Sequence, residues 1–260
     1  MKFICGDEFK ALCDFSFDED GFKKNENKNQ FFKEPLVFIK TDYLFDLIDK
    51  VVSEPIRIIT HNSDLCIDEK YIPLLNCENI IHWYGQNISI NHPKLSSIPI
   101  GIANPKWPHG NKQILQECVN KNHKKTNLVY ANFTVGTNPT ERGLCLSSVK
   151  KNSIDFISGL SFENYLDDLS KSMFSISPNG NGIDCHKTWE SLYLNTIPIV
   201  TKSINSSQYS HLPILIIEKW DDLDKIELNR NLYMSKLKNF NKSYLNIEKF
   251  IKNERPILHP

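Results

Sequence analysis

The segment from Met173 to Val200 constrains the fold more than any other part of the chain. It contains, in order, an apolar strand, a loop with two glycines, a helical stretch and a second apolar strand. Glycine lets a backbone approach a ligand closely, and the N–H groups at a helix start attract anions. Asp184 is suited to cap this helix at its start, and Asn195 is suited to its end. The pattern predicts an α/β protein with an anion-binding loop, although similar turns also occur in proteins that bind no phosphate.

The helix in this segment carries two residues that can serve a ligand. His186 and Glu190 lie four positions apart and therefore share one helical face. Trp189, Leu192 and Tyr193 supply its buried side. Alone, a helical glutamate is usually solvated and a single histidine is usually structural. Their combination with the glycine loop within fourteen residues favours a functional site.

Strands and helices alternate along the whole chain, which predicts parallel sheets with ligands beyond the carboxyl ends of their strands. Polar segments after residues 60 and 177 fall at such ends. Residues 14–33 are expected to form a surface loop. The predicted strands are 2–5, 36–39, 56–60, 80–84, 98–102, 128–133, 154–157, 173–177, 197–200 and 214–217. The predicted helices are 42–52, 112–120, 141–150, 162–170, 184–194, a short one near 206, 226–239 and 244–252.

Composition excludes several classes of function. The 260 residues carry 31 basic and 31 acidic side chains, so no basic excess indicates a nucleic-acid partner. Charge appears too early for a signal peptide, and no apolar run approaches the roughly 20 residues of a spanning helix. Seven cysteines without zinc-ligand spacing predict reduced thiols and a cytoplasmic protein. No G-x-G-x-x-G follows an early strand, which argues against a Rossmann dehydrogenase.

Three segments resemble exostosin-like glycosyltransferases, including the short versions of large DNA viruses and some bacteria, and they occur in the order expected for that family. They are 177–200, 91–111 with its Asn-His-Pro-Lys-Leu start, and 138–142. The resemblance covers residues 56–225 and implies the GT-B fold, two Rossmann-like domains with parallel sheets facing a central cleft. We expect an acceptor-side domain over 1–122, a nucleotide-sugar domain over 123–240, and a helix over 241–260 packing back on the first domain. A viral origin would place the enzyme in the host cytoplasm.

The same resemblance implies the donor site of a UDP-sugar. Glu190 resembles the family's helical glutamate that accepts hydrogen bonds from the ribose hydroxyls. Arg142 and the loop backbone are expected to hold the pyrophosphate, because arginine presents a fork of donors that matches phosphate oxygens. Arg142 could equally be a solvated helix residue, and His186 could contact a phosphate or the donor sugar. The full set of expected donor-binding residues is Arg142, Ser177, Asn179, Gly180, Asn181, Gly182, His186 and Glu190.

An inverting transfer also needs a base that deprotonates the acceptor hydroxyl. We expect this base in the first domain, with Asp64 as first choice, His61 as second and His109 as third. Trp107 could stack on an acceptor sugar ring. The alternatives are a helix-capping role for Asp64 and a rigid loop without substrate contact around Trp107. A retaining transfer needs none of these bases.

Metal dependence is the main rival within this class of enzyme. The segments 18–20 and 222–224 both match Asp-x-Asp, a very permissive pattern. We interpret both as incidental and predict activity without metal, with the UDP-sugar as co-substrate and no cofactor. The expected partners are a nucleotide-sugar donor and a carbohydrate acceptor, with xylose, glucose or N-acetylglucosamine as the transferred sugar. A nucleotide-sugar epimerase and an inactive glycan-binding relative remain as alternatives.

Overall fold

The computed structural model describes residues 2–26, 32–45 and 54–251 of the chain. It divides into two compact units. The N-terminal unit comprises Ile4–Ile100 with Ile247–Pro260, and the C-terminal unit comprises Gly101–Asn246 with Met1–Phe3. Each unit is built on its own sheet, and the α/β class with two Rossmann-like, mainly parallel sheets is confirmed.

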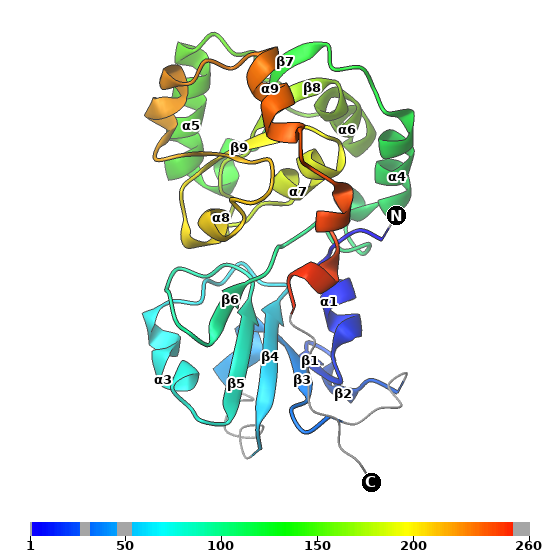
Figure 1. Cartoon of the computed structure of the whole chain (residues 1–260), viewed down its shortest axis with the longest axis vertical. Helices are drawn as coiled ribbons and strands as arrows, with labels where there is room; N and C mark the ends of the chain where they lie inside the picture. Colours follow the sequence, from blue (N-terminus) through cyan, green and yellow to red (C-terminus); the bar gives the residue numbers. More distant parts are fainter. Residues whose placement is uncertain (1, 27–31, 46–53, 252–260) are drawn as a thin grey trace. The chain divides into compact units, whose positions relative to one another are not determined.

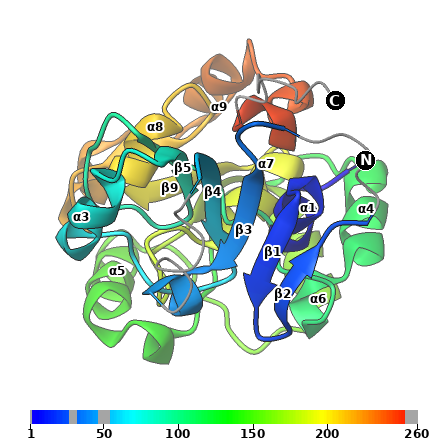
Figure 2. The ribbon, with the colours of Figure 1, turned by 90° about the horizontal axis from the view of Figure 1, so that it is seen from below.

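The N-terminal unit contains a six-stranded sheet in the order β2-β1-β3-β4-β5-β6. All neighbouring strands are parallel except β1 and β2, which form an antiparallel hairpin at one edge. Figure 2 shows β2, β1, β3 and β4 side by side in this order. The strands are β1 (Phe15–Asp18), β2 (Gly21–Lys24), β3 (Leu36–Lys40), β4 (Ile56–His61), β5 (Ile80–Gly85) and β6 (Leu95–Ser97). The helical elements are α1 (Gly6–Leu12), η1 (Thr41–Tyr43), η2 (Glu69–Tyr71), α3 (Ile72–Leu75), and η7 (Ile247–Lys249).

The C-terminal unit contains a four-stranded, fully parallel sheet in the order β10-β9-β8-β7. Figure 1 shows its strands among helices α5, α6, α7 and α9. Its strands are β7 (Asn127–Ala131), β8 (Ser172–Ile176), β9 (Ile197–Thr201) and β10 (Leu215–Ile217). Its α-helices are α4 (Lys112–Lys121), α5 (Pro139–Lys151), α6 (Phe162–Ser170), α7 (His186–Tyr193), α8 (Ile204–Gln208) and α9 (Arg230–Leu237). Its 3-10 turns are η3 (Pro108–Gly110), η4 (Val135–Thr137), η5 (Trp220–Lys225) and η6 (Lys242–Tyr244).

Burial explains why these strands form. Strand β8 is buried at every position, and Ile197 and Ile199 of β9 are fully buried beside it. A strand covered on both faces needs a continuous apolar run rather than an alternating pattern. Helix α7 packs on this sheet with Trp189 completely enclosed, and the Trp189 ring meets Tyr209 edge-on at 5.1 Å. The core therefore lies directly beneath the glycine loop.

Three strand predictions and one loop prediction were wrong in kind or position. Residues 2–5 form no strand, because Cys5 already precedes helix α1. The expected loop over 14–33 contains the β1–β2 hairpin, whose turn uses Gly21 at a φ of 82°. A strand at 98–102 is replaced by β6 before it, and Gly101 takes a φ of 67° that breaks extended structure. Residues 154–157 contribute only one pairing, between Phe156 and Ala131.

Helix ends and unit boundaries also differ from the prediction. Helix α7 begins at His186 after Cys185, and Asp184 instead accepts from the Cys185 N–H at 2.8 Å and from Trp189 Nε1. The helix expected over 42–52 lies mostly outside the described residues, and the one over 244–252 is replaced by short 3-10 turns. The units divide at residues 100 and 101 rather than at 122 and 123. Helix α4 joins the C-terminal unit because it packs on α6, where Cys118 Sγ lies 3.4 Å from the Leu166 carbonyl oxygen.

Candidate functional site

The connections of the C-terminal sheet reverse direction between β7 and β8. After β7 the chain runs to Phe156, which pairs with Ala131 on one side of β7. Strand β8 pairs with β7 on its other side. The chain leaves β8 in the opposite direction, through α7 to β9. Parallel sheets bind ligands at such a reversal, beyond the carboxyl ends of the strands. The loops 132–138 and 177–185 border this position.

Arg142 ties these two loops together. Its Nε donates to the Asn179 carbonyl at 2.8 Å, and its Nη1 donates to the Thr134 carbonyl at 2.8 Å. Asn138 reinforces the link by donating to the Gly180 carbonyl at 3.0 Å. Arg142 is only 7% exposed, which rules out the solvated helix arginine considered above. Its first role is to hold the glycine loop in shape.

The loop backbone is less open to anions than the sequence predicts. The Asn179 N–H donates to Glu141 Oε1 at 3.2 Å, and the Gly180 N–H donates to the Gly182 carbonyl at 3.1 Å. We expected the backbone N–H groups of residues 179–182 to bind the pyrophosphate. Two of these four groups already donate to acceptors within the protein. A side chain at Gly180 would place its Cβ 3.2 Å from Arg142 Nη2, so glycine keeps that face of the guanidinium uncovered.

Helix α7 starts with a histidine that belongs to a row of rings. His186 Nδ1 lies 2.8 Å from the Gly101 carbonyl oxygen. Because a carbonyl oxygen can only accept, Nδ1 is the donor, and Nε2 is the unprotonated nitrogen of the neutral ring. The His186 ring lies 6.0 Å from the His109 ring, which in turn lies 6.4 Å from Trp107 at an interplanar angle of 18°. Trp107 is 53% exposed, and burial lowers the pKa of His109. This row lies in the C-terminal unit, which corrects the expected first-domain position of Trp107 and His109.

Glu190 lies one turn further along α7 and is 3% exposed. Tyr165 of α6 donates its hydroxyl to Glu190 Oε2 at 2.6 Å. Burial raises the pKa of Glu190 to about 7, and the Tyr165 bond and the nearby Lys187 charge only partly oppose this. The sequence analysis missed both Tyr165 and Lys187. Lys187 could have been found from its position three residues before Glu190 on the same face, whereas Tyr165 gave no local signal.

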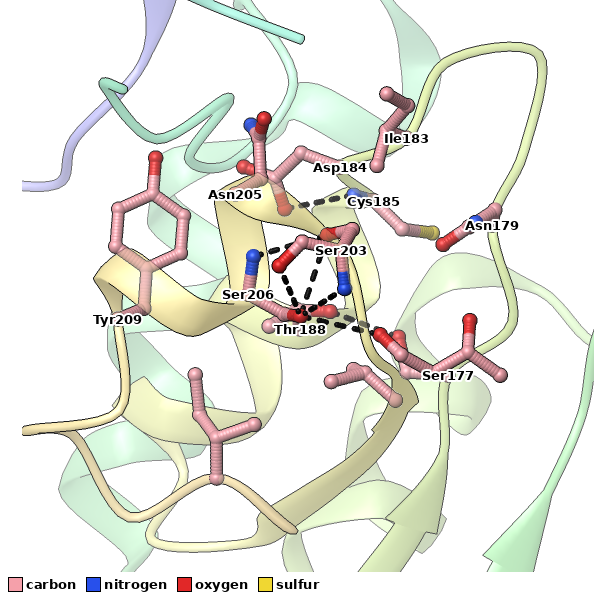
Figure 3. A pocket seen from close by; sticks show the side chains of 13 residues that line it. Ser177, Asn179, Ile183, Asp184, Cys185, Thr188, Ser203, Asn205, Ser206 and Tyr209 are labelled. Atoms are coloured by element: carbon pink, nitrogen blue, oxygen red, sulfur yellow. Dashed lines mark hydrogen bonds between the residues drawn. The ribbon is translucent and has the colours of Figure 1, made fainter. Parts of the chain in front are cut away.

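A small cavity lies beside the glycine loop, between the ends of β8 and β9 (Figure 3). It has a volume of about 20 Å³, which fits a water molecule and excludes a nucleotide. Ser177 lines it and is buried, with its hydroxyl 2.9 Å from that of Thr188. Ser177 therefore links the end of β8 to α7, and its expected contact with the donor stays a prediction.

In the N-terminal unit, the base candidates differ in exposure. His61 is buried, and its Nε2 donates to the Pro99 carbonyl at 3.1 Å while its Nδ1 accepts from the Asn62 N–H at 2.7 Å. Both ring nitrogens are therefore occupied, which argues against a base role. Asp64 is exposed on the loop after β4. Gln86 steadies this loop by accepting from the Asn62 N–H at 3.0 Å.

The Asp-x-Asp carboxylates pair with lysines. Asp20 lies 3.0 Å from Lys23, and Asp224 lies 2.6 Å from Lys151. Asp18 pairs with Lys10 and Asp222 with Lys225 in the same way. Within the described ranges no cluster of three His, Cys, Asp or Glu side chains is arranged to hold a metal ion. Nor does any helix in the described ranges have the length and apolarity to cross a bilayer.

The chain is similar to the α,α-trehalose-phosphate synthase (UDP-forming) from Burkholderia vietnamiensis, with a TM-score of 0.45 and 10% sequence identity. The similarity covers 85% of this chain and 74% of the synthase. No protein-family model and no curated protein sequence matches the chain.

Proposed function

We propose that the chain is a glycosyltransferase that moves a sugar from a UDP-sugar to a glycan hydroxyl. The observation that carries this proposal is the position of Glu190. It is a buried carboxylate on the helix that directly follows a glycine loop, at the reversal point of a parallel sheet. The same segment carries the exostosin-like pattern of the sequence.

Each part of the donor has a candidate partner in this unit. Glu190 Oε1 makes no hydrogen bond with the described residues, and we assign it to the ribose hydroxyls. Arg142 already spans the two loops, and its Nη2 faces Gly180, where it can approach the diphosphate. Stabilising the departing diphosphate is the largest electrostatic demand of the reaction. His186, at the start of α7, is the candidate contact to the donor sugar.

The acceptor roles are proposed for both units. Asp64 is the preferred base, because its carboxylate is exposed on a steadied loop whereas His61 is buried with both ring nitrogens in use. Trp107 offers an exposed ring face of the kind that stacks on sugars.

One observation favours the alternative of an inactive glycan-binding relative. Glu190 Oε2 and the N–H groups of Asn179 and Gly180 are all engaged within the protein. Such a relative would keep the Trp107 platform and bind glycans without binding a sugar nucleotide. An epimerase would instead bind the nucleotide and convert the donor without any acceptor.

The test is calorimetric titration with UDP, GDP, ADP and CMP, each with and without manganese. We expect selective micromolar binding of UDP that needs no metal. UDP-sugars are then incubated with and without oligosaccharide acceptors. UDP release that requires an acceptor supports transfer, and donor conversion without an acceptor supports the epimerase. Glycan binding without any nucleotide binding would reject the glycosyltransferase.

A further inference from the structure

Lys187 carries a buried ammonium group in the first turn of helix α7. Its side chain is 8% exposed, and its Nζ makes no hydrogen bond within the part of the chain that the structure describes. The rings of Tyr130 and Tyr165 lie 5.6 and 5.2 Å from Nζ. Such contacts attract a desolvated cation to the ring faces. Taking an ammonium out of water costs more than ring contacts return, and its three N–H donors still need acceptors. The two rings therefore leave the charge undercompensated.

The groups around Lys187 supply only part of the missing negative charge. Burial lowers the pKa of Lys187 to about 8, so it remains mostly protonated at neutral pH. Arg142 adds a second positive charge nearby, which lowers the Lys187 pKa further. Burial raises the pKa values of Cys185 and Cys145, so both thiols stay neutral. Glu190 is only partly ionised at pH 7, because its pKa is raised to about 7. The cluster is thus net positive when no ligand is bound.

The position of this positive charge coincides with the predicted ligand position. Lys187 lies in the first turn of α7, immediately after the glycine loop. Tyr130 is the penultimate residue of β7, so its ring marks the carboxyl end of the strand at the reversal point. Arg142, on α5, holds the two loops that border the same position. Two cations from two helices therefore converge where a parallel sheet binds its ligand.

We propose that Lys187, together with Arg142, binds the diphosphate of the sugar nucleotide. This inference rests on the proposed function for the identity of the ligand. Because the ammonium is enclosed, a side chain over it must move for the anion to enter. The side chain we assign is Tyr165, since it covers Lys187 and also donates to Glu190 Oε2. Its movement would release Glu190 Oε2 for the ribose in addition to Oε1, so diphosphate and ribose recognition are coupled.

The experiment measures binding of UDP-glucose and inorganic pyrophosphate to the full chain by calorimetry. Lys187→Met keeps the length of the side chain and removes its charge. Lys125→Met is the matched control, because Lys125 is half-buried but bonds to the Leu194 carbonyl at 2.9 Å and to Thr196 Oγ1 at 2.7 Å. We expect Lys187→Met to lose at least tenfold in affinity for both ligands without a lower melting temperature. Lys125→Met should melt earlier and, where folded, bind normally.

The outcomes separate the two proposals. Unchanged UDP-glucose affinity in folded Lys187→Met overturns the role of Lys187 and leaves the proposed function standing. Lys187-dependent binding of pyrophosphate with no binding of UDP-glucose keeps the anion site and rejects the proposed function. No binding of either ligand to the wild type rejects both.

A pH series on the wild type tests the inference without any variant. The diphosphate of UDP-glucose carries constant charge between pH 7 and pH 9, and its uracil ring loses the N3 proton only above this range, so changes in affinity report on the protein. Lys187, with a pKa of about 8 in the free protein, loses its charge across this range. We expect affinity to fall by up to about tenfold between pH 8 and pH 9. A flat profile from pH 7 to pH 9 overturns the inference.

Discussion

Replacing Glu190 by glutamine should stabilise the ligand-free protein while weakening its binding of the donor. Glutamine keeps the shape of the side chain and can still accept a hydrogen bond from the Tyr165 hydroxyl, but it carries no charge. The pKa of Glu190 rises from 4.5 to about 7 on folding. At 1.36 kcal/mol per pKa unit, this corresponds to about 3 kcal/mol of destabilisation from the buried carboxylate.

The sign of this effect depends on pH. The folded state binds the Glu190 proton more tightly than the unfolded state, so stability falls as pH rises from 4.5 to 7. The full cost is present above pH 7 and absent below pH 4.5. Glu190→Gln should therefore gain up to about 3 kcal/mol at pH 8 and almost nothing at pH 5. Loss of the attraction to Lys187 subtracts from this gain, which makes it an upper bound.

Scanning calorimetry at pH 5 and pH 8 measures this difference, and it resolves two transitions if the units unfold separately. Glu163→Gln is the matched control, because Glu163 is exposed on α6 and the chemical change is identical. We expect the control to stay within about 0.5 kcal/mol of the wild type at both pH values. In the same Glu190→Gln protein, UDP affinity should fall by roughly 1–3 kcal/mol through the loss of charge-assisted hydrogen bonds. A variant that is less stable at pH 8, or equally affected at both pH values, refutes the reasoning.

Three further predictions address the base, the backbone and the metal. Asp64→Asn should leave UDP-sugar affinity near normal and lower turnover about 10²-fold or more. Initial-rate measurements test this, and full activity of the variant would assign the base to His109 or indicate a retaining mechanism. Gly110→Ala should lower stability by about 1–3 kcal/mol in calorimetry, because its Cβ would lie 2.0 Å from the Asn104 carbonyl oxygen. Gly143→Ala, in open space on α5, should instead gain about 0.5–1 kcal/mol, and equal effects of the two would refute the steric argument. Transfer assays should retain activity in EDTA, and complete loss that manganese restores would falsify metal independence.

Much of the fold could be predicted because the buried strands are local signals. Strands β3, β4, β8 and β9 are mainly apolar segments, and their predicted bounds agree with the structure to within one residue. Strand β1 was missed because only Phe15 and Phe17 mark it within a charged stretch. Its pairing with β3 depends on residues about twenty positions away, which no local pattern reveals.

The candidate site was only partly accessible to sequence analysis. The glycine loop and Glu190 lie together on one segment, so their pattern was visible. The bond from Tyr165 joins residues 25 positions apart, and it depends on how α6 packs on α7. Likewise, nothing in the order of residues distinguishes the enclosed Lys187 from a solvated lysine. Burial and charge compensation are properties of the packed unit, and they appear only with the tertiary structure.

The Arg142 contacts have a consequence for how such an enzyme can diversify. Arg142 and Asn138 grip the glycine loop through the carbonyl oxygens of Asn179 and Gly180, and a carbonyl is the same whatever side chain its residue bears. The contacts that hold the loop therefore do not depend on the side chain of residue 179. Libraries that vary this position can be screened for new sugar preferences while these contacts are kept. Because Arg142 bonds only to backbone atoms of the loop, the neighbouring side chains can change during evolution.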